Sequence, residues 1–127
     1  MPAEANRKSI AQEYVGRIND GDVQGVLDLF GDDVVFEDPV GKPPIIGKDA
    51  LRRHIEFAVK CGVRERMGTP VTSMDGRYVV TPTKVTVFAP TKIDFNIIGV
   101  LEVGEDGLGH RLRAFWGETD MTIAKAR

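Results

Sequence analysis

The sequence is poor in the residue types that build disulfide frameworks and metal clusters. It contains one cysteine, Cys61, and two histidines, His54 and His110, among 127 residues. A single cysteine excludes an internal disulfide and a multi-cysteine zinc site, and two histidines so far apart in the chain form no local metal-binding motif. We therefore expect neither a metal ion nor a cofactor.

Long apolar runs and a strong charge of either sign are also missing. No segment approaches the roughly 18 apolar residues of a membrane-spanning helix, and the N-terminus lacks the apolar core of a signal peptide. The formal net charge of -2 makes no electrostatic case for nucleic acid or an anionic membrane. The length and a 42% hydrophobic content suit one soluble globular domain, residues 1–127. We predict a cytoplasmic protein that binds neither nucleic acid nor membrane.

Several catalytic motifs are absent as well. The glycines are scattered among turns and form no phosphate-binding loop, and neither Ser9 nor Ser73 lies in a nucleophile elbow. Glu37 and Asp38 are adjacent, so on a strand they would point to opposite faces and could not act as a carboxylate pair. Chemistry without a cofactor would have to rest on one buried base and hydrogen-bond donors.

The first half of the chain has helical periodicity. Residues 6–20 carry apolar side chains at four-residue spacing, and Gly21 suits the left-handed position beyond a helix end. A shorter helix capped by Asp22 is expected to include Phe30 in its apolar set and to end at residues 31–33. A third helix is predicted over residues 48–60. Tyr14 lies on the apolar stripe of the first helix, where its hydroxyl needs either a partner or a cavity.

The second half has the composition of strands. Residues 64–73, 78–88, 93–103 and 110–116 are rich in β-branched and aromatic side chains and are separated by turn signals. Residues after Thr119 read as a short tail. Helices followed by strands predict an α+β fold in which a curved, mixed or antiparallel sheet wraps around three N-terminal helices and encloses a conical apolar pocket.

Asp38 is the candidate base. It follows the strand-forming residues 34–36, and Pro39 biases it toward an extended backbone, so its side chain leaves the end of a strand among apolar neighbours. Such a carboxylate, partly withdrawn from water, is a better proton acceptor near neutral pH. The alternative is a solvated aspartate in a turn. His54 could touch a ligand on the third helix, but a histidine among charged neighbours is usually a surface residue.

These residues resemble the bacterial Δ5-3-ketosteroid isomerases, within the superfamily that also holds nuclear transport factor 2-like and SnoaL-like proteins. The resemblance rests on Tyr14, on residues 19–22 and 29–33, on residues 37–41 (Glu-Asp-Pro-Val-Gly) and on residues 113–118 (Arg-Ala-Phe-Trp-Gly-Glu). It implies that Asp38 moves a proton between two carbons of a 3-oxo-Δ5 steroid. Tyr14 would donate a hydrogen bond to the oxygen of the dienolate. In those isomerases the surroundings of two carboxyl groups set their pKa values apart, so that one acts as a base and the other stays protonated.

One family position departs from the pattern. Where the isomerases have a protonated aspartic acid as a second donor, this chain has Gly99, whose side chain donates nothing. Asp94 and Asn96 are the nearest alternatives on the same strand, but strand alternation points them to the opposite face unless a bulge intervenes. Either a displaced donor exists or the oxyanion hole is weakened, and losing one such donor typically costs about a hundred- to a thousandfold in rate.

The remaining expectations concern the pocket walls and the partners. Trp116, Phe88, Phe57 and Gly99 are the expected contacts of a flat apolar ligand such as a steroid. The resemblance also implies a homodimer formed through the open face of the sheet. The main hypothesis is a steroid isomerase. Two alternatives stay open: a polyketide-cyclase-like enzyme with another substrate on the same fold, and a steroid- or lipid-binding module. An epoxide hydrolase is disfavoured, because that chemistry uses an Asp-Arg-Asp set and the predicted strands offer no such trio.

Overall fold

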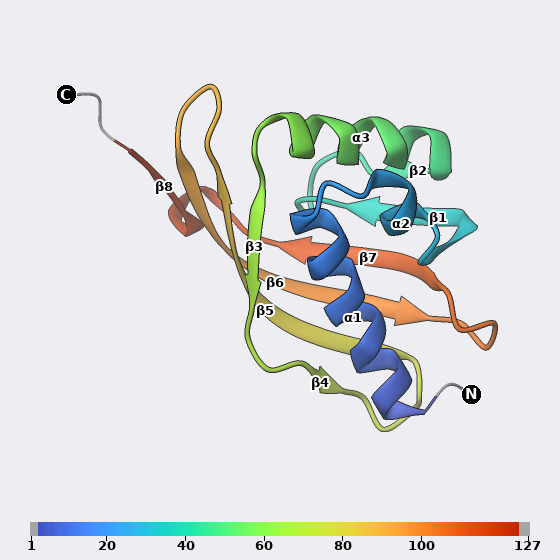
Figure 1. Ribbon diagram of the computed structural model, residues 1–127. Coiled ribbons are helices and arrows are strands. Elements are labelled where there is room, and N and C mark those ends of the chain that lie inside the picture. Colours follow the sequence, from blue (N-terminus) through green and yellow to red (C-terminus); the bar gives the residue numbers. More distant parts are fainter. Residues whose placement is uncertain (1–2, 125–127) are drawn as a thin grey trace.

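The computed structural model describes residues 3–124 and has an α+β architecture with helices on one face of a curved, unclosed sheet (Figure 1). The helices are α1 (Glu4–Asn19), α2 (Val23–Leu27) and α3 (Lys48–Lys60), with a short 3-10 helix, η1, at Glu118–Asp120. The strands are β1 (Phe30–Glu37), β2 (Ile45–Ile46), β3 (Arg64–Met67), β4 (Val71–Thr72), β5 (Tyr78–Val87), β6 (Ile93–Val103), β7 (Gly109–Phe115) and β8 (Met121–Ile123). The predicted fold class is confirmed.

The sheet is mixed. Its strand order is β2-β1-β7-β6-β5-β3, with β4 paired to β5 and β8 paired to β6. All pairs are antiparallel except β1 and β7, which run parallel. The β5–β6 ladder runs without a register shift from Tyr78↔Glu102 to Val87↔Ile93. Every second residue of β6 therefore faces the helices.

Local sequence signals explain the helix boundaries. Gly21 has φ +69°, the left-handed conformation expected beyond α1, and the Asp22 side chain accepts a hydrogen bond of 2.9 Å from the Gly25 amide to cap α2. Gly62, with φ +74°, follows α3 in the same way. These stops turn the chain back over the sheet, so that all three helices cover the same face (Figure 1).

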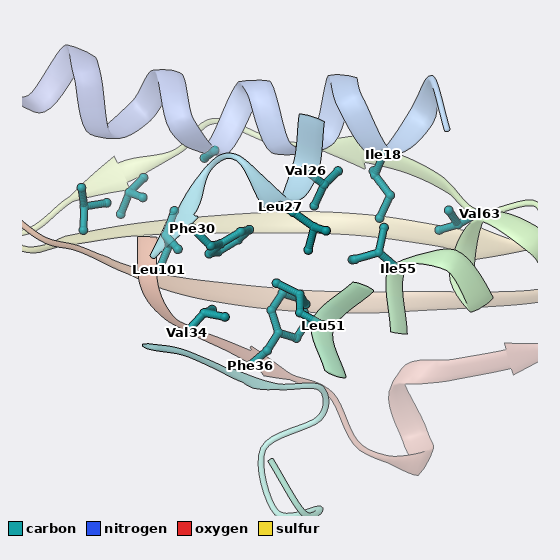
Figure 2. Packing of buried hydrophobic residues seen from close by; sticks show 13 residues of the cluster. Ile18, Val26, Leu27, Phe30, Val34, Phe36, Leu51, Ile55, Val63 and Leu101 are labelled. Carbon is teal, nitrogen blue, oxygen red and sulfur yellow. The ribbon is translucent and has the colours of Figure 1, made fainter. Parts of the chain in front are cut away.

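The apolar core lies between the helices and the sheet. Side chains from α1, α2, α3, β1 and β6 converge on it in Figure 2, and Phe30, Phe36, Leu51 and Ile55 are almost fully buried. Burying a side chain of this size contributes about 1.5–3 kcal/mol. This packing holds the end of β1, and with it Asp38, against α1 and α3.

Three element boundaries differ from the predictions. Phe30 begins β1 rather than ending the second helix, because it pairs with Gly109, where a Cβ would lie 2.9 Å from the Phe30 ring. The strand predicted over residues 64–73 is interrupted after Met67, where Pro70 cannot donate to a ladder. Residues 118–123 form η1 and β8 rather than a tail.

The opposite face of the sheet is not covered by helices (Figure 1). It carries exposed Ile98 and Phe115, and a broad depression of 890 Å³ beside them. Homodimer formation through this face stays a prediction. Within residues 3–124, no helix is long and apolar enough to cross a membrane.

Candidate active site

Asp38 lies immediately after β1, and strand alternation separates it from its neighbour Glu37. Glu37 accepts hydrogen bonds of 2.9 and 2.6 Å from Arg111 on the uncovered face, whereas Asp38 turns to the helix side. The Trp116 indole donates to Asp38 Oδ1 at 2.8 Å, and His54 Nε2 lies 3.2 Å from Asp38 Oδ2. Each carboxylate oxygen thus has one nitrogen partner, which fixes the orientation of the group.

Asp38 opens into a cavity with an inner and an outer part. The inner part measures 80 Å³ and the outer part 370 Å³, and Tyr14, Asp38 and Glu65 line both. The other walls are mostly apolar: Phe30, Phe36, Val79, Leu101, Leu112 and Ala114 inside, and Ile55, Ala58, Val63, Val87, Ile93 and Phe95 outside. A deep apolar cavity with a few converging polar groups is the usual form of a small-molecule site.

Glu65 is a candidate functional residue that the sequence analysis missed. It lies on β3, and its side-chain carboxyl makes no hydrogen bond to another described residue. Burial, reinforced by the negative charge of Asp38, raises the pKa of the Glu65 carboxyl to about 8, so that it is largely protonated at pH 7. One signal was available. Glu65 lies between Val63 and Met67 in the inward phase of the strand, where an unpaired acid is unexpected.

Tyr14 completes the polar part of the cavity. Its ring lies 6.1 Å from Phe30 and 6.4 Å from Phe36, and its hydroxyl makes no hydrogen bond within residues 3–124. Burial and the charges of Glu65 and Asp38 raise the pKa of the phenol well above its ordinary value. The hydroxyl therefore stays neutral and can donate a hydrogen bond to a ligand oxygen.

A comparison with known protein families places this chain in one of them. Residues 11–111 match the SnoaL-like domain. The chain belongs to the SnoaL-like family. The resemblance seen in the sequence therefore holds at the level of this superfamily, and the narrower ketosteroid isomerase family is not confirmed.

One relative of this SnoaL-like protein is named as an epoxide hydrolase. It is 43% identical over 125 residues to the epoxide hydrolase LasB of Streptomyces lasalocidi, and the match covers 94% of this chain and 44% of LasB. The chain thus spans less than half the length of that relative.

Two solved structures share the fold of this chain. SalBIII, an epoxide hydrolase/cyclase-like enzyme with a role in pyran ring formation in the polyether salinomycin, superposes with a TM-score of 0.92. It is 29% identical, and the match covers 98% of this chain and all of SalBIII (100%). RV0760c from Mycobacterium tuberculosis superposes with a TM-score of 0.87 at 20% identity, covering 98% of this chain and 100% of RV0760c, which shows the shared fold alone.

The predicted pocket residues of this SnoaL-like protein have different locations. Trp116 lines the outer cavity and bonds Asp38, and Gly99 lines the inner part. Phe57 lines the outer part and is 66% exposed, which places it at the mouth. Phe88 does not line the cavity but packs beside Gly62 with 54% exposed. His54, expected at the surface, instead contacts Asp38.

Gly99 leaves its part of the cavity without a side chain, and neither Asp94 nor Asn96 replaces the missing donor. A Cβ at Gly99 would find only the Thr81 carbonyl oxygen, 3.7 Å away, so the position faces open cavity. Asp94 is exposed and bonds the Thr86 hydroxyl, and Asn96 lines the depression on the uncovered face. The alternative that a bulge turns either side chain inward is wrong, because the ladder is regular there. The protonated acid in this cavity is Glu65, from a different strand.

The site has no obvious metal ligands. In the described part of the chain, no three side chains of histidine, cysteine, aspartate or glutamate lie close enough together to hold a metal ion. The polar groups of the cavity can instead accept a proton at Asp38, donate one from Glu65 and donate a hydrogen bond from Tyr14.

Proposed function

We propose that this SnoaL-like protein opens epoxides by acid–base catalysis, with a hydroxyl group of the same substrate, or water, as the nucleophile. One observation carries the proposal. Two carboxyl groups face one apolar cavity, and Glu65 is kept protonated by burial while Asp38 is bonded by the nitrogens of Trp116 and His54. An acid that burial keeps protonated can donate a proton, and a second carboxylate in the same cavity can accept one.

Epoxide opening needs both roles in one step. The nucleophile oxygen forms a bond to one epoxide carbon as the bond from that carbon to the epoxide oxygen breaks. Asp38 takes the proton of the attacking hydroxyl, and Glu65 gives its proton to the epoxide oxygen, so charge does not accumulate on either oxygen. The neutral Tyr14 hydroxyl donates a hydrogen bond to the same oxygen as negative charge develops. The step leaves Asp38 protonated and Glu65 ionised, and transfer of that proton from Asp38 to Glu65 restores the starting state, so the net reaction neither consumes nor releases a proton.

The apolar walls favour the substrate hydroxyl over water as the nucleophile. A cavity lined by phenylalanine, valine and leucine side chains holds a hydrocarbon chain with its own hydroxyl close to the epoxide, and leaves little room for bulk water. Intramolecular attack then yields a cyclic ether rather than a diol. The similarity to LasB and SalBIII supports this class of reaction.

An isomerase acting on a 3-oxo-Δ5 steroid is the second candidate, favoured by one observation. Tyr14 and Asp38 line the same cavity, and protonated Glu65 supplies there the second donor that Gly99 lacks. In this scheme Asp38 would shuttle the proton, while Tyr14 and Glu65 would stabilise the dienolate.

Parallel assays separate the two candidates. Purified protein is given a 4,5-epoxy alcohol that can close to a tetrahydrofuran or tetrahydropyran ring, in water enriched in ¹⁸O, and products are followed by mass spectrometry. A cyclic ether without the label, lost in Asp38→Asn and Glu65→Gln, is the expected result. A labelled diol identifies a hydrolase instead. Turnover of 5-androstene-3,17-dione to the conjugated enone, with no epoxide opened above the background rate, would overturn the proposal in favour of the isomerase.

A further inference from the structure

Strand β3, which carries Glu65, lies at an edge of the sheet. Its only strand partner in the described chain is β5, in the register Glu65↔Val85. The backbone amide and carbonyl of Glu65 that face away from β5 would therefore lack a strand partner. A short edge strand of this kind is weakly held in register from one side alone, so its outer contacts matter for where residue 65 points.

The side chain of Asn19, the last residue of α1, forms hydrogen bonds with both of those backbone groups. Asn19 Nδ2 donates to the Glu65 carbonyl oxygen at 2.8 Å, and the Glu65 amide donates to Asn19 Oδ1 at 2.7 Å. Next to this pair, Arg64 Nη1 donates to the backbone oxygen of Asn19 at 2.9 Å. A single side-chain amide thus replaces a neighbouring strand at one residue.

Resting on the proposed function, we propose that Asn19 is a positioning residue that holds the Glu65 carboxyl in the cavity. It does so by fixing the register of β3 from the side opposite β5. Because strand side chains alternate, a slip of one residue would turn Glu65 out and bring Arg64 or Arg66 in. Asn19 itself touches no reacting atom.

The environment of Glu65 makes its placement measurable. The ionisable groups that share its cavity are Tyr14 from α1, Asp38 at the end of β1, His54 from α3 and Cys61 just after α3. Burial is the largest cause of the raised pKa of Glu65, and the charge of Asp38 is the second. A loosened β3 admits water to the carboxyl, so its pKa falls from about 8 toward the ordinary value for glutamate.

Asn19 could simply tie a helix to a strand, and a control for that role lies two residues earlier. Arg17 Nη1 donates to the Gly25 carbonyl oxygen at 2.7 Å and ties the same end of α1 to α2, without touching β3. Arg17→Ala therefore removes a comparable tertiary contact of the same helix. A purely structural role predicts the same behaviour from Asn19→Ala and Arg17→Ala.

The test measures the Glu65 pKa directly, by NMR of protein with ¹³C-labelled glutamate carboxyls, in wild type, Asn19→Ala and Arg17→Ala. Glu65→Gln assigns the signal. We expect the Glu65 pKa to fall by about one unit or more in Asn19→Ala and to stay unchanged in Arg17→Ala. The kcat for the epoxy alcohol should fall about tenfold in Asn19→Ala. The alkaline limb of its kcat–pH profile should move to lower pH by the same amount as the Glu65 pKa.

Contrary outcomes are equally defined. A folded Asn19→Ala with the wild-type Glu65 pKa, or an equal shift in Arg17→Ala, would overturn the positioning role. If Asn19→Ala does not fold, Asn19→Ser removes the two-sided contact more mildly and is held to the same criterion. Because the NMR measurement needs no turnover, failure of wild type to open epoxides would overturn the proposed function alone.

Discussion

Two histidine–carboxylate clusters of this protein use the same groups in opposite surroundings. In the cavity, His54 contacts Asp38, and the remaining polar atoms face an apolar hollow. At the surface, His110 lies 2.6 Å from Asp33 and 2.9 Å from Asp106, and its ring packs against Gly31 and Gly104. A Cβ added at Gly31 or at Gly104 would lie 2.7 Å from the nearest atom of the His110 ring. The surface cluster thus holds β1, the β6–β7 turn and β7 together through close packing and hydrogen bonds.

The two sites differ in whether every ionisable group has a hydrogen-bonded partner. In the surface cluster, the hydrogen bonds that the His110 ring donates to Asp106 and Asp33 raise the pKa of His110. The Leu108 amide and His110 lower the pKa of Asp106, so the groups stabilise one another. In the cavity, burial leaves Glu65 protonated and without a hydrogen-bonded partner. Ionisable groups held in a costly state at a hollow are typical of a catalytic site, whereas mutually satisfied ones are typical of structure.

The largest effect is expected from Asp38→Asn. The substitution keeps the shape of the side chain but removes the base, and kcat for epoxide opening should fall about a thousandfold or more. Loss of the Asp38 charge should also lower the pKa of Glu65, since that charge is one of its causes. Rate assays and carboxyl NMR measure the two effects. Activity retained within tenfold would remove Asp38 from the mechanism.

Glu65→Gln should have the next largest effect, because it removes the acid but keeps the size of the side chain. We expect kcat to fall about a hundred- to a thousandfold. In wild type, the activity should decline as the pH rises through about 8, where Glu65 loses its proton. The pH–rate profile is the measurement, and an unaltered alkaline limb in a still active Glu65→Gln would contradict the assignment.

The same substitution should change how stability depends on pH. The folded protein holds a proton on Glu65 that the unfolded chain releases above its ordinary pKa, so wild-type stability falls as the pH rises from about 4.5 to about 8. Glu65→Gln lacks this loss. Urea unfolding at both ends of this window should show the variant gaining up to about 4 kcal/mol relative to wild type at the alkaline end.

Tyr14→Phe should reduce activity less, because one hydrogen-bond donor is lost while acid and base remain. A fall of about ten- to a hundredfold in kcat is expected, with KM nearly unchanged if the bond strengthens in the transition state. Steady-state kinetics tests this. A rise in KM alone would make Tyr14 a binding residue rather than a stabiliser of developing charge.

His110→Gln, in the surface cluster, should have the smallest effect. Exposed ion pairs contribute about 0–1 kcal/mol, so unfolding should show a loss below about 1 kcal/mol and no change in activity. Because the folded-state pKa of His110 is raised, its contribution is complete below about pH 6.5, the ordinary value, and is lost as the pH rises through the folded-state pKa. A large loss of activity would show that the two clusters are coupled.

Much of the fold was predictable from local patterns. Helices α1 and α3, strands β5, β6 and β7, and the left-handed glycine at position 21 follow from periodicity and turn chemistry, and they were confirmed. Phe30 was misassigned because its strand partner, Gly109, lies far along the chain. Strand β8 was read as a tail because three residues carry too little pattern to predict a strand that depends on pairing with β6.

The candidate site divides in the same way. The placement of Asp38 opposite Glu37 is a local property, because adjacent strand residues face opposite sides, and the sequence alone determined it. That Glu65 joins Asp38 and Tyr14 in one cavity, and that His54 contacts Asp38, only the tertiary structure decided. The protonation of Glu65 depends on burial and on charges brought near through space, and neither quantity exists until the sheet has curved around the helices.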